Sequence, residues 1–329
     1  CHRGGTECGP GRETLKGPEM TKRVLTVGGA QMGPVMRADS KAATVARMVD
    51  LMRQAHARSC DLVVFPELAL TTFFPRWFIE DQAELDSFYE FTMPSAVTQP
   101  LFDAARELQV GFHLGYAEVD GEHRFNTAIL VDKAGEIVAK YRKIHLPGHA
   151  EFDPEREFQH LEKRYFEVGN LGFPVWETMG GKLGMLICND RRWPEAFRML
   201  GLQDVELVVI GYNTPTLNGQ TFEPPHLRIH HNLLTMQAGA YQNGAWVCGV
   251  AKAGYEDGVH MMGSSAIVTP NGEIAALAST LEDELIVADC DLDAGAYIKT
   301  NIFNFAAHRR TEHYGLIVET TGTVPPRGT

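Results

Sequence analysis

Two patterns of apolar residues alternate along this 329-residue chain. Short continuous apolar runs, typical of strands buried on both faces, predict strands at residues 23–28, 61–65, 110–118, 183–187, 205–213 and 245–250. Helices are predicted between them, at residues 41–56, 101–108, 194–200 and 229–243. The first of these helices collects its apolar residues on one face: Val45, Met48, Val49, Met52 and Ala55. This succession of strands and helices predicts an α/β architecture.

The second half of the chain repeats the pattern of the first. Residues 125–141 (FNTAILVDKAGEIVAKY) and 264–279 (SSAIVTPNGEIAALAS) each contain an apolar strand, a turn ending in Gly-Glu-Ile and a second strand. The run DLVVFPE at residue 61 likewise has a counterpart in VELVVIGYN at residue 205. Strand–turn–strand patterns also recur by chance. If the repeat is a duplication, it predicts a four-layer α-β-β-α sandwich with an internal pseudo-two-fold.

The chain is expected to form a single domain over residues 20–329, because no interior linker or low-complexity run divides it. Residues 1–19 are glycine-rich and lack apolar periodicity, so we expect a disordered leader or an added extension, with Met20 as the natural start. After Asp293 the pattern is less regular and richer in aromatic and basic residues. Such a terminus either frays or docks on a neighbouring subunit.

Composition narrows the possible partners. The chain is 44% hydrophobic and 22% charged, as in globular proteins, and its formal charge of -12 argues against nucleic acid or an anionic membrane as the main partner. No apolar stretch approaches the roughly 18 residues that cross a bilayer, and the start lacks a secretory h-region. The six cysteines show no C-x-x-C pair and no zinc-ligand spacing. We therefore expect a cytoplasmic protein.

Three segments place a reactive side chain just beyond a predicted strand: Glu67, Lys143 and Cys188. A thiol nucleophile needs a base, and burial raises the pKa of a carboxylate toward the range in which it accepts a proton. A lysine supplies the fixed positive charge that stabilises an oxyanion. The adjacent Arg191 and Arg192, together with the start of the 194–200 helix, favour a thiolate at Cys188. Alternatively, Cys188 is a core residue, Glu67 a surface acid and Lys143 part of a solvated charged run, and spacing does not decide between these interpretations.

The motifs around these residues resemble a known superfamily. FPELAL, KYRKIHLPG and ICNDRRWPE, in this order, resemble the three catalytic blocks of the nitrilase (carbon-nitrogen hydrolase) superfamily. The longer stretches ELALTTFFPRW, RFNTAILVDKAGEIVAKYRKIHLPGH, FQHLEKRYFEVGNLGFPV and ICNDRRWPEAFR resemble N-carbamoyl-D-amino acid amidohydrolases in particular. The resemblance covers residues 23–317 and implies the sandwich fold, a homodimer or homotetramer with the C-terminal tail at its interface, and a Glu67–Lys143–Cys188 triad.

The same resemblance implies further roles in the site. Glu162 is implied as a second buried acid that supports the triad, and no cofactor or metal is implied. Arg191 and Arg192 are implied to bind the carboxylate of an N-carbamoyl amino acid, for which a planar guanidinium has suitable geometry; the alternative is a structural salt bridge to Asp190 or Glu195. The other residues implied to lie at the pocket are His145, His160, Asn189, Asn213 and Thr214.

Other functions remain open from the residues alone. A nitrilase, an aliphatic amidase or an N-carbamoyl-β-alanine hydrolase would carry similar motifs, and a non-catalytic binding or scaffold protein would keep the fold. The pairs His226/His230 and His145/His149 have metal-ligand spacing, but neither sits in an H-E-x-x-H motif. No Walker loop, G-x-G-x-x-G or G-x-S-x-G motif is present. The aromatic residues Phe73, Phe74, Trp77 and Trp193 either line a pocket or fill the core.

Overall fold

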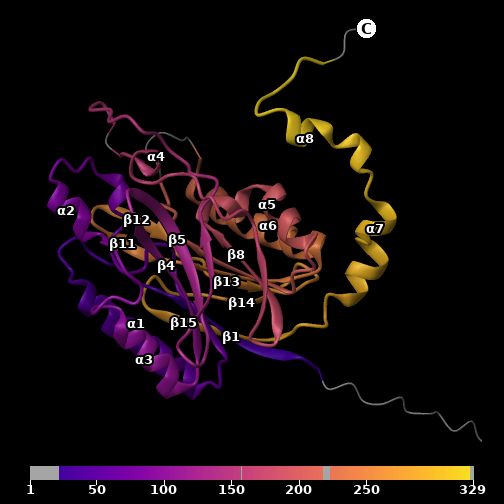
Figure 1. The fold of residues 1–329 in the computed structure, drawn as a ribbon, viewed down its shortest axis with the longest axis horizontal. Helices are drawn as coiled ribbons and strands as arrows, with labels where there is room; N and C mark the ends of the chain where they lie inside the picture. Colours follow the sequence, from indigo (N-terminus) through magenta and orange to yellow (C-terminus); the bar gives the residue numbers. More distant parts are fainter. Residues whose placement is uncertain (1–21, 157, 218–222, 327–329) are drawn as a thin grey trace, which may run out of the picture.

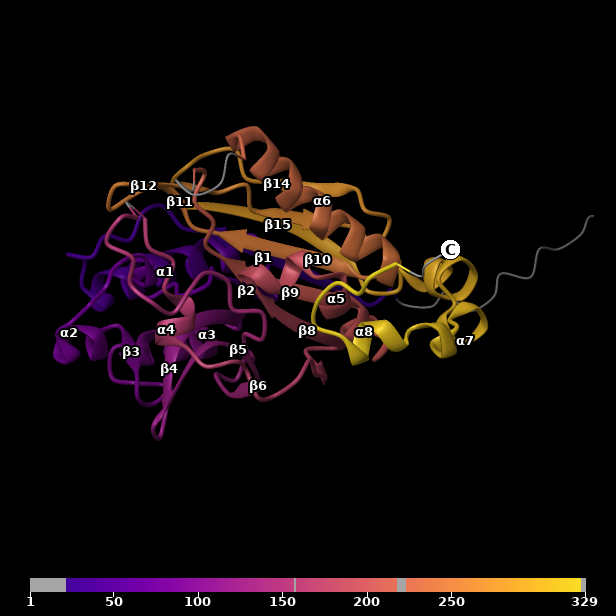
Figure 2. The same cartoon turned by 90° about the horizontal axis from the view of Figure 1, so that it is seen from above.

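The computed structural model describes residues 22–156, 158–217 and 223–326, so the predicted leader at 1–19 lies outside the described residues. Within these ranges the strands form a seven-stranded sheet, a six-stranded sheet and a two-stranded ribbon. Figures 1 and 2 show the two large sheets face to face, with helices on both outer faces. The predicted α/β architecture and its four layers are thus confirmed.

The seven-stranded sheet contains most of the first half of the chain. Its strands run in the order β15-β1-β2-β4-β5-β6, with β3 paired to β4. Strands β1, β2 and β4 are parallel, whereas β5, β6 and the edge strand β15 pair antiparallel with their neighbours. The strands are β1 (Val24–Gln31), β2 (Leu62–Val64), β3 (Tyr89–Glu90), β4 (Gly111–Asp120), β5 (His123–Val131), β6 (Ile137–Arg142) and β15 (Glu284–Asp291).

The six-stranded sheet reproduces that arrangement. Its order is β14-β13-β10-β9-β8-β7, with β8, β9 and β10 parallel and β13, β14 and the edge strand β7 antiparallel. The two predicted hairpins occupy equivalent places as β5–β6 and β13–β14, so the duplication is present in the strand order. The strands are β7 (Val175–Thr178), β8 (Gly181–Ile187), β9 (Leu207–Tyr212), β10 (Trp246–Ala251), β13 (Ala266–Val268) and β14 (Ile274–Leu277).

Apolar burial holds the layers together. Helices α1 (Lys41–Ala57) and α3 (Gln99–Leu108) pack on the outer face of the seven-stranded sheet, and α5 (Pro194–Gly201) and α6 (Pro225–Asn243) on that of the six-stranded sheet. The predicted apolar face of α1 is buried, and Ser40 caps this helix by accepting from Ala43 N. Helix α6 ends at Gly244 as predicted, with the φ of +59° that favours glycine.

Several elements were not predicted. Most of their sequences lack a continuous apolar run, whereas β15 contains one at residues 285–288 (LIVA). These elements include β3, β7, β15, α2 (Gln82–Ser87), α4 (Glu162–Tyr165) and the ribbon β11–β12 (Ala253–Glu256 and Val259–Met262). The C-terminal arm, residues 298–319, contains the π-helix η3 (Ile298–Ile302), α7 (Phe305–His308), the 3-10 turn η4 (Thr311–His313) and α8 (Gly315–Glu319). Figure 1 shows this arm in yellow, extending away from the body of the molecule. Short, edge or one-sided elements such as these give weak sequence signals.

Two observations bear on the setting of the protein. The cysteines in the described part of the chain, Cys60, Cys188, Cys248 and Cys290, are all free and buried. Among the described residues, none of the helices combines the length and the apolar character that crossing a membrane requires.

The topology brings polar groups together at one edge. The parallel strands β2, β8, β9 and β10 end on the same side of the sandwich, and Glu67, Cys188, Asn213 and Lys252 lie just beyond these ends. Ligands in α/β folds gather at the carboxyl ends of parallel strands. The candidate site is therefore expected at this edge.

Candidate active site

Cys188 lies in a strained turn at the end of β8. Its φ of +46° is in the left-handed region, which a residue other than glycine adopts only when its surroundings enforce it. The turn is held by Arg191, whose Nη1 donates to the Cys188 carbonyl (2.7 Å), and by Asp190, whose carboxylate accepts from Ile187 N (3.1 Å). The Cys188 side chain reaches a cavity of about 380 Å³. The turn at the end of β8 thus places the thiol in the wall of this cavity.

Glu67 is completely buried and accepts hydrogen bonds on both carboxylate oxygens. Oε1 accepts from Lys143 Nζ (2.7 Å) and Asn126 Nδ2 (2.8 Å), and Oε2 accepts from Asn213 N (2.9 Å). The Asn213 side chain in turn donates to the Glu67 carbonyl (2.7 Å), while the Cys188 Sγ donates to the Asn213 carbonyl at 3.5 Å. Asn213 therefore connects the carboxylate to the thiol.

Lys143 bridges two buried carboxylates. Its Nζ donates to Glu67 Oε1 (2.7 Å) and to Glu162 Oε2 (2.6 Å), and all three side chains are fully buried. The other oxygen of Glu162 contacts His160 Nε2 at 3.0 Å. Cys188 lies within electrostatic range of Glu67, Lys143 and Glu162. The structure therefore brings the three predicted triad residues and Glu162 into one charged cluster.

The pKa values of the two carboxylates in this cluster, Glu67 and Glu162, are shifted in opposite directions. Burial raises the pKa of Glu67 above its usual range, although Lys143 opposes that effect. The pKa of Glu162 is lowered, because the attraction of Lys143 and the hydrogen bond from His160 outweigh its burial. Burial by itself lowers the pKa of Lys143, but Cys188, Glu162 and Glu67 raise it well above its ordinary value. This separation is what a proton-accepting role for Glu67 would require, and it keeps Lys143 positively charged.

The thiol is not a resting thiolate, which corrects the expectation from the neighbouring arginines. Burial, followed by the negative charge of Glu67, raises the pKa of Cys188, and the opposing charges of Lys143 and Arg191 do not reverse the shift. A raised pKa keeps Cys188 protonated near neutrality. A nucleophilic role for Cys188 would therefore require a base to take its proton, and Glu67 is a carboxyl with a raised pKa within electrostatic range of the thiol.

The two adjacent arginines have different environments. Arg191 is buried under the turn, where its guanidinium also donates to Asn232 Oδ1 (2.8 Å) and Thr214 Oγ1 (3.1 Å). Arg192 is exposed, lines the cavity and forms no hydrogen bond or ion pair with any residue in the described ranges. Each of the three guanidinium nitrogens of Arg191 donates to a protein acceptor, so of the two adjacent arginines only Arg192 lines the described wall of the cavity. Neither guanidinium is paired with Asp190 or Glu195 among the described contacts.

His145 supports the turn that carries Cys188 and is not part of the described cavity wall. Its Nδ1 and backbone N contact Asp190 Oδ1 at 2.8 Å and 2.9 Å, and its ring stacks on Trp193 with centroids 5.0 Å apart. Asp190 is buried and also accepts from the Tyr141 hydroxyl (2.7 Å). Asn189, which lines the cavity, donates through Nδ2 to the His145 carbonyl (3.1 Å). These contacts fix the backbone of the turn from below.

The cavity at Cys188 is polar and basic. His160, Asn189, Asn213 and Thr214 line it as the resemblance implied, whereas Phe73, Phe74, Trp77 and Trp193 are absent from its described wall and Phe73 and Phe74 fill the core. The described wall contains no aspartate or glutamate. Its residues are Pro147, Gly148, His149, Arg156, His160, Cys188, Asn189, Arg192, Asn213, Thr214, Pro215 and Arg228.

Three contributors were missed from the sequence. Asn126 sits in the middle of the apolar strand β5, and a polar amide in such a run was the available signal. Arg156 and Arg228 enter the cavity wall from a loop and from α6, where basic residues are common on the surface. Arg228 is paired with Glu223 (2.9 Å) and Arg156 with Asp153 (2.8 Å). Only tertiary structure places these two arginines near the thiol.

The histidines with metal-ligand spacing have other surroundings. His149 contacts Gln159 through Nε2 (3.1 Å) and Arg156 through Nδ1 (3.0 Å), while His226 and His230 are exposed on α6. Within residues 22–156, 158–217 and 223–326, no group of three or more His, Cys, Asp or Glu side chains is arranged to hold a metal ion.

Comparison with known proteins agrees with this geometry. The carbon-nitrogen hydrolase family profile matches residues 26–299. A nitrilase from Pyrococcus abyssi is 29% identical over 291 residues, covering 88% of this chain and 99% of that protein. An N-carbamoylputrescine amidase from Solanum lycopersicum is 26% identical over 317 residues, covering 92% and 98%.

The fold is shared with solved structures as well. The crystal structure of a carbon-nitrogen hydrolase from Helicobacter pylori superposes with a TM-score of 0.79 at 24% identity, covering 91% of this chain and 99% of that one. The family match spans both sheets and every strand end that contributes to the cluster around Cys188. The chain therefore belongs to the carbon-nitrogen hydrolase family, the nitrilase superfamily.

Proposed function

We propose that this chain hydrolyses N-carbamoyl-D-amino acids to the D-amino acid, ammonia and carbon dioxide. The proposal rests on one observation: the Cys188 thiol and the guanidinium of Arg192 line the same cavity, and Arg192 has no partner among the described residues. A carboxylate is the group that a free guanidinium binds best, through two parallel charge-assisted hydrogen bonds. A substrate with a carboxylate at one end and an amide-like carbon at the other fits this pair.

The charge of the cavity favours an anionic substrate over a cationic one. Its described wall contains three arginines and no carboxylate, and Arg228 and Arg156 already have acidic partners. N-carbamoylputrescine, the substrate in the name of the tomato relative, carries an ammonium group at neutral pH. Placing that charge near an unpaired arginine is repulsive. The wall thus supports an N-carbamoyl amino acid over an N-carbamoyl amine.

A free acceptor supports the orientation of the carbamoyl group. Asn213 Oδ1 is buried, lines the cavity and has no hydrogen-bond partner among the described residues, while the amide nitrogen of the same side chain is held by Glu67. A carbamoyl group offers N–H donors on both sides of its carbonyl carbon. Donation to Asn213 Oδ1 would turn that carbon toward the Cys188 thiol and satisfy the buried oxygen.

The chemical steps use the groups of the cluster in turn. Glu67 takes the Cys188 proton, and the thiolate attacks the carbamoyl carbon to form a C–S bond, while Lys143 and the Asn189 backbone N–H stabilise the oxyanion. Glu67 returns the proton to the departing ammonia as the C–N bond breaks. Water, deprotonated by Glu67, then cleaves the C–S bond, and the released carbamate decomposes to carbon dioxide and the amino acid. The D configuration in this proposal comes from the resemblance of the motifs.

A substrate panel tests the proposal. Wild-type enzyme is expected to release ammonia from N-carbamoyl-D-amino acids at least tenfold faster, in kcat/KM, than from N-carbamoylputrescine, propionamide, a nitrile or N-carbamoyl-β-alanine, because only the first group places a carboxylate at Arg192 in this geometry. Chiral analysis of the amino acid product checks the configuration. A preference for N-carbamoylputrescine or for the L enantiomers would contradict the proposal.

The arginine pair provides a matched control for the panel. Arg192→Met is expected to raise KM for the N-carbamoyl amino acid about tenfold or more, with the free energy of unfolding unchanged, since Arg192 has no described partner to lose. Arg191→Met removes three hydrogen bonds under the turn and is expected to lower the thermal midpoint instead. Equal KM values for Arg192→Met and wild type would show that Arg192 does not bind the substrate carboxylate.

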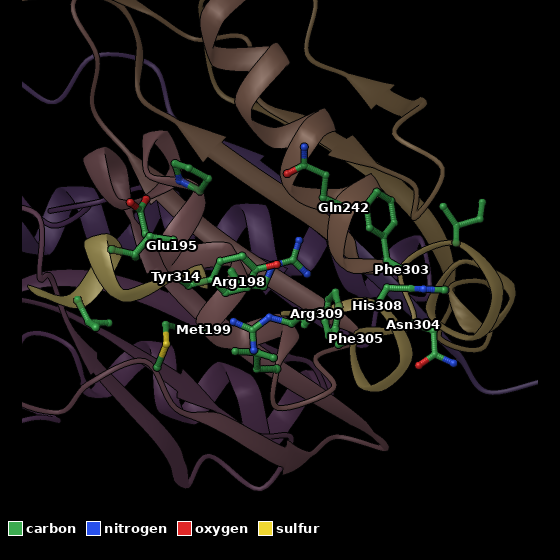
Figure 3. A pocket seen from close by; sticks show the side chains of 15 residues that line it. Glu195, Arg198, Met199, Gln242, Phe303, Asn304, Phe305, His308, Arg309 and Tyr314 are labelled. Carbon is green, nitrogen blue, oxygen red and sulfur yellow. The ribbon is translucent and has the colours of Figure 1, made fainter. Parts of the chain in front are cut away.

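We also propose that the chain forms a homodimer or homotetramer through α5, α6 and the C-terminal arm. A cavity of about 500 Å³ lies between α5 and the arm, and Figure 3 shows side chains from α5, such as Arg198 and Met199, facing Phe305 and Tyr314 of the arm. Leu316, Ile317 and Val318 of α8 are 59%, 60% and 85% exposed. Contiguous exposed apolar residues of this kind mark association surfaces.

The oligomer is tested by light scattering coupled to gel filtration. Wild-type protein is expected to elute as a dimer or tetramer at micromolar concentration, and Ile317→Glu combined with Val318→Glu to shift it toward the monomer, because charges do not pack in an apolar interface. Val168→Glu, at a 61% exposed site away from the arm, is the control and should leave the mass unchanged. A monomeric wild type would contradict the proposal.

A further inference from the structure

We propose that Lys252 is a positioning residue for the general base: its buried ammonium holds the chain segment that comes after Glu67 and adds a second positive charge within electrostatic range of that carboxylate. The inference rests on the proposed role of Glu67 as the base, and it extends that role to a residue outside the Glu67–Lys143–Cys188 cluster. Lys252 comes directly after β10, as Cys188 comes after β8 and Asn213 after β9.

Lys252 reaches the segment after Glu67 from the neighbouring strand. Its backbone N donates to the Tyr212 carbonyl (3.4 Å), one residue before Asn213, which is hydrogen-bonded to Glu67. Its side chain is completely buried, and Nζ donates to the Thr71 carbonyl while lying 3.4 Å from Glu256 Oε2. A lysine with no exposed atoms pays a large desolvation cost, so its ammonium needs these partners.

Glu256 completes the clamp on the same segment. Its Oε1 accepts from Phe73 N (2.9 Å), Thr72 Oγ1 (3.2 Å) and Arg76 Nη2 (2.6 Å), and the Arg76–Glu256 pair is buried. Residues 71–76 are thereby tied to the end of β11 by one carboxylate, and to the end of β10 by one ammonium. Removing Lys252 would leave Glu256 with Arg76 alone, and removing Glu256 would leave the two buried cations without the carboxylate they share.

The clamped segment controls both carboxylates of the site. Leu68, directly after Glu67, has a φ of +44°, so the backbone leaves Glu67 in a strained conformation that needs outside support. Further along, the Phe73 ring contacts His160 edge-on with centroids 5.8 Å apart, and His160 is the hydrogen-bond partner of Glu162. A shift of residues 71–73 would therefore displace Glu67 at one end and Glu162 at the other.

The charges of the two buried groups are complementary. The catalytic group contains two carboxylates and one ammonium, with Cys188, Arg191 and His160 also facing it. The group around Lys252 contains two cations, Lys252 and Arg76, and one buried carboxylate, Glu256, with the partly exposed Asp257 at its rim. Burial lowers the pKa of Lys252, and the carboxylates of Glu256 and Glu67 both oppose this shift, which places Glu67 within electrostatic range of the ammonium. A nearby cation favours the ionised form of a carboxyl group.

The test separates the charge of Lys252 from its packing. Lys252→Gln keeps a donor for the Thr71 carbonyl but removes the charge, whereas Lys252→Arg keeps a charge at the same place. For Lys252→Gln we expect kcat to fall about tenfold with KM changed less than about threefold, and the acid limb of the kcat/KM profile to move to higher pH by about one unit, because the pKa of Glu67 rises when a nearby cation is lost. For Lys252→Arg we expect the acid limb to stay at the wild-type pH.

Controls keep the result interpretable. Lys299→Met removes another lysine that bonds a carbonyl and a carboxylate, but far from Glu67, and should leave the pH profile unchanged. The assay uses whichever amide the wild type hydrolyses fastest, so a wrong substrate class in the proposed function does not alter the comparison between variants. Lys252→Gln could be insoluble. In that case the proposal is still supported if Lys252→Arg keeps the wild-type pH profile of kcat/KM and the acid limb of Glu256→Gln is displaced from it. The proposal would be overturned if the acid limb stayed at the wild-type pH in both Lys252→Gln and Glu256→Gln. It would also be overturned if Lys252→Arg moved the acid limb as far as Lys252→Gln does.

Discussion

Replacement of Cys188 by alanine is expected to lower kcat by about four orders of magnitude or more, since the proposed covalent step needs a thiol. Cys188 is the one cysteine in the described wall. Substrate binding should persist, because the anchor proposed for the carboxylate, Arg192, and the free Asn213 Oδ1 are untouched. Alanine fits the same turn with only the sulfur lost. Isothermal titration of Cys188→Ala with an N-carbamoyl-D-amino acid, beside an ammonia-release assay, measures both quantities.

Covalent labelling distinguishes this role from that of a core thiol. Iodoacetamide is expected to modify Cys188, which lines the cavity, and to spare Cys60, Cys248 and Cys290, which lie in the core and are absent from the described cavity wall. Cys248→Ala, in the core between the sheets, is the matched control: it should retain turnover and lose some stability. Ammonia release by Cys188→Ala, or labelling of wild type at other cysteines alone, would contradict the assignment and favour the non-catalytic alternative.

Strand ends made much of the fold and the central cluster predictable. Glu67, Lys143 and Cys188 each come just after a strand, and parallel strands bring the residues at their carboxyl ends to a common edge. The repeated hairpins likewise predicted two equivalent half-sheets. The continuous apolar runs predicted that the central strands are buried on both faces. These predictions depend only on residues close together in sequence.

The features that the sequence did not reveal depend on side-chain direction and on distant contacts. Arg191 and Arg192 are adjacent and chemically identical, yet the 3-10 turn η2 (Cys188–Arg192) sends one under the nucleophile and the other to the cavity. Their expected effect on Cys188 was also outweighed by burial and by Glu67, neither of which is visible in a linear motif. The clamp of Lys252 and Glu256 joins residues about 180 positions apart.

Replacement of Glu67 by glutamine is expected to reduce kcat by about 100-fold to 10,000-fold, because this carboxyl, with its raised pKa, is the proposed acceptor of the Cys188 proton. Glutamine has the same shape and keeps an oxygen for Lys143 and Asn126. Its amide nitrogen, however, would face the Asn213 N–H, a donor that now binds Glu67 Oε2. We therefore expect a moderate loss of stability in addition. Steady-state kinetics and thermal unfolding separate the two effects.

The matched control is another buried glutamate of the same sheet. Glu118 accepts from Arg142 (2.8 Å), Lys140 (2.6 Å) and Thr127 (2.6 Å), and although its burial acts in the opposite direction these partners lower its pKa to about 2. Glu118→Gln should cost about 2 kcal/mol of unfolding free energy, yet keep kcat near the wild-type value, because Glu118 is not part of the described wall of the cavity at Cys188. Equal kcat losses in the two variants would mean that Glu67 acts through stability alone.

The pH profile gives the second readout for Glu67. A carboxyl whose pKa is raised stays protonated, and inactive as a base, to a higher pH than an ordinary glutamate. Wild-type kcat/KM is therefore expected to increase as pH rises through that raised value, with the limb belonging to the coupled group of Glu67, Lys143 and Glu162. The limb should be absent in Glu67→Gln and intact in Glu118→Gln. If it persisted in Glu67→Gln, the proton acceptor would be another group, and Glu162, the second carboxylate on Lys143, would be the next to replace.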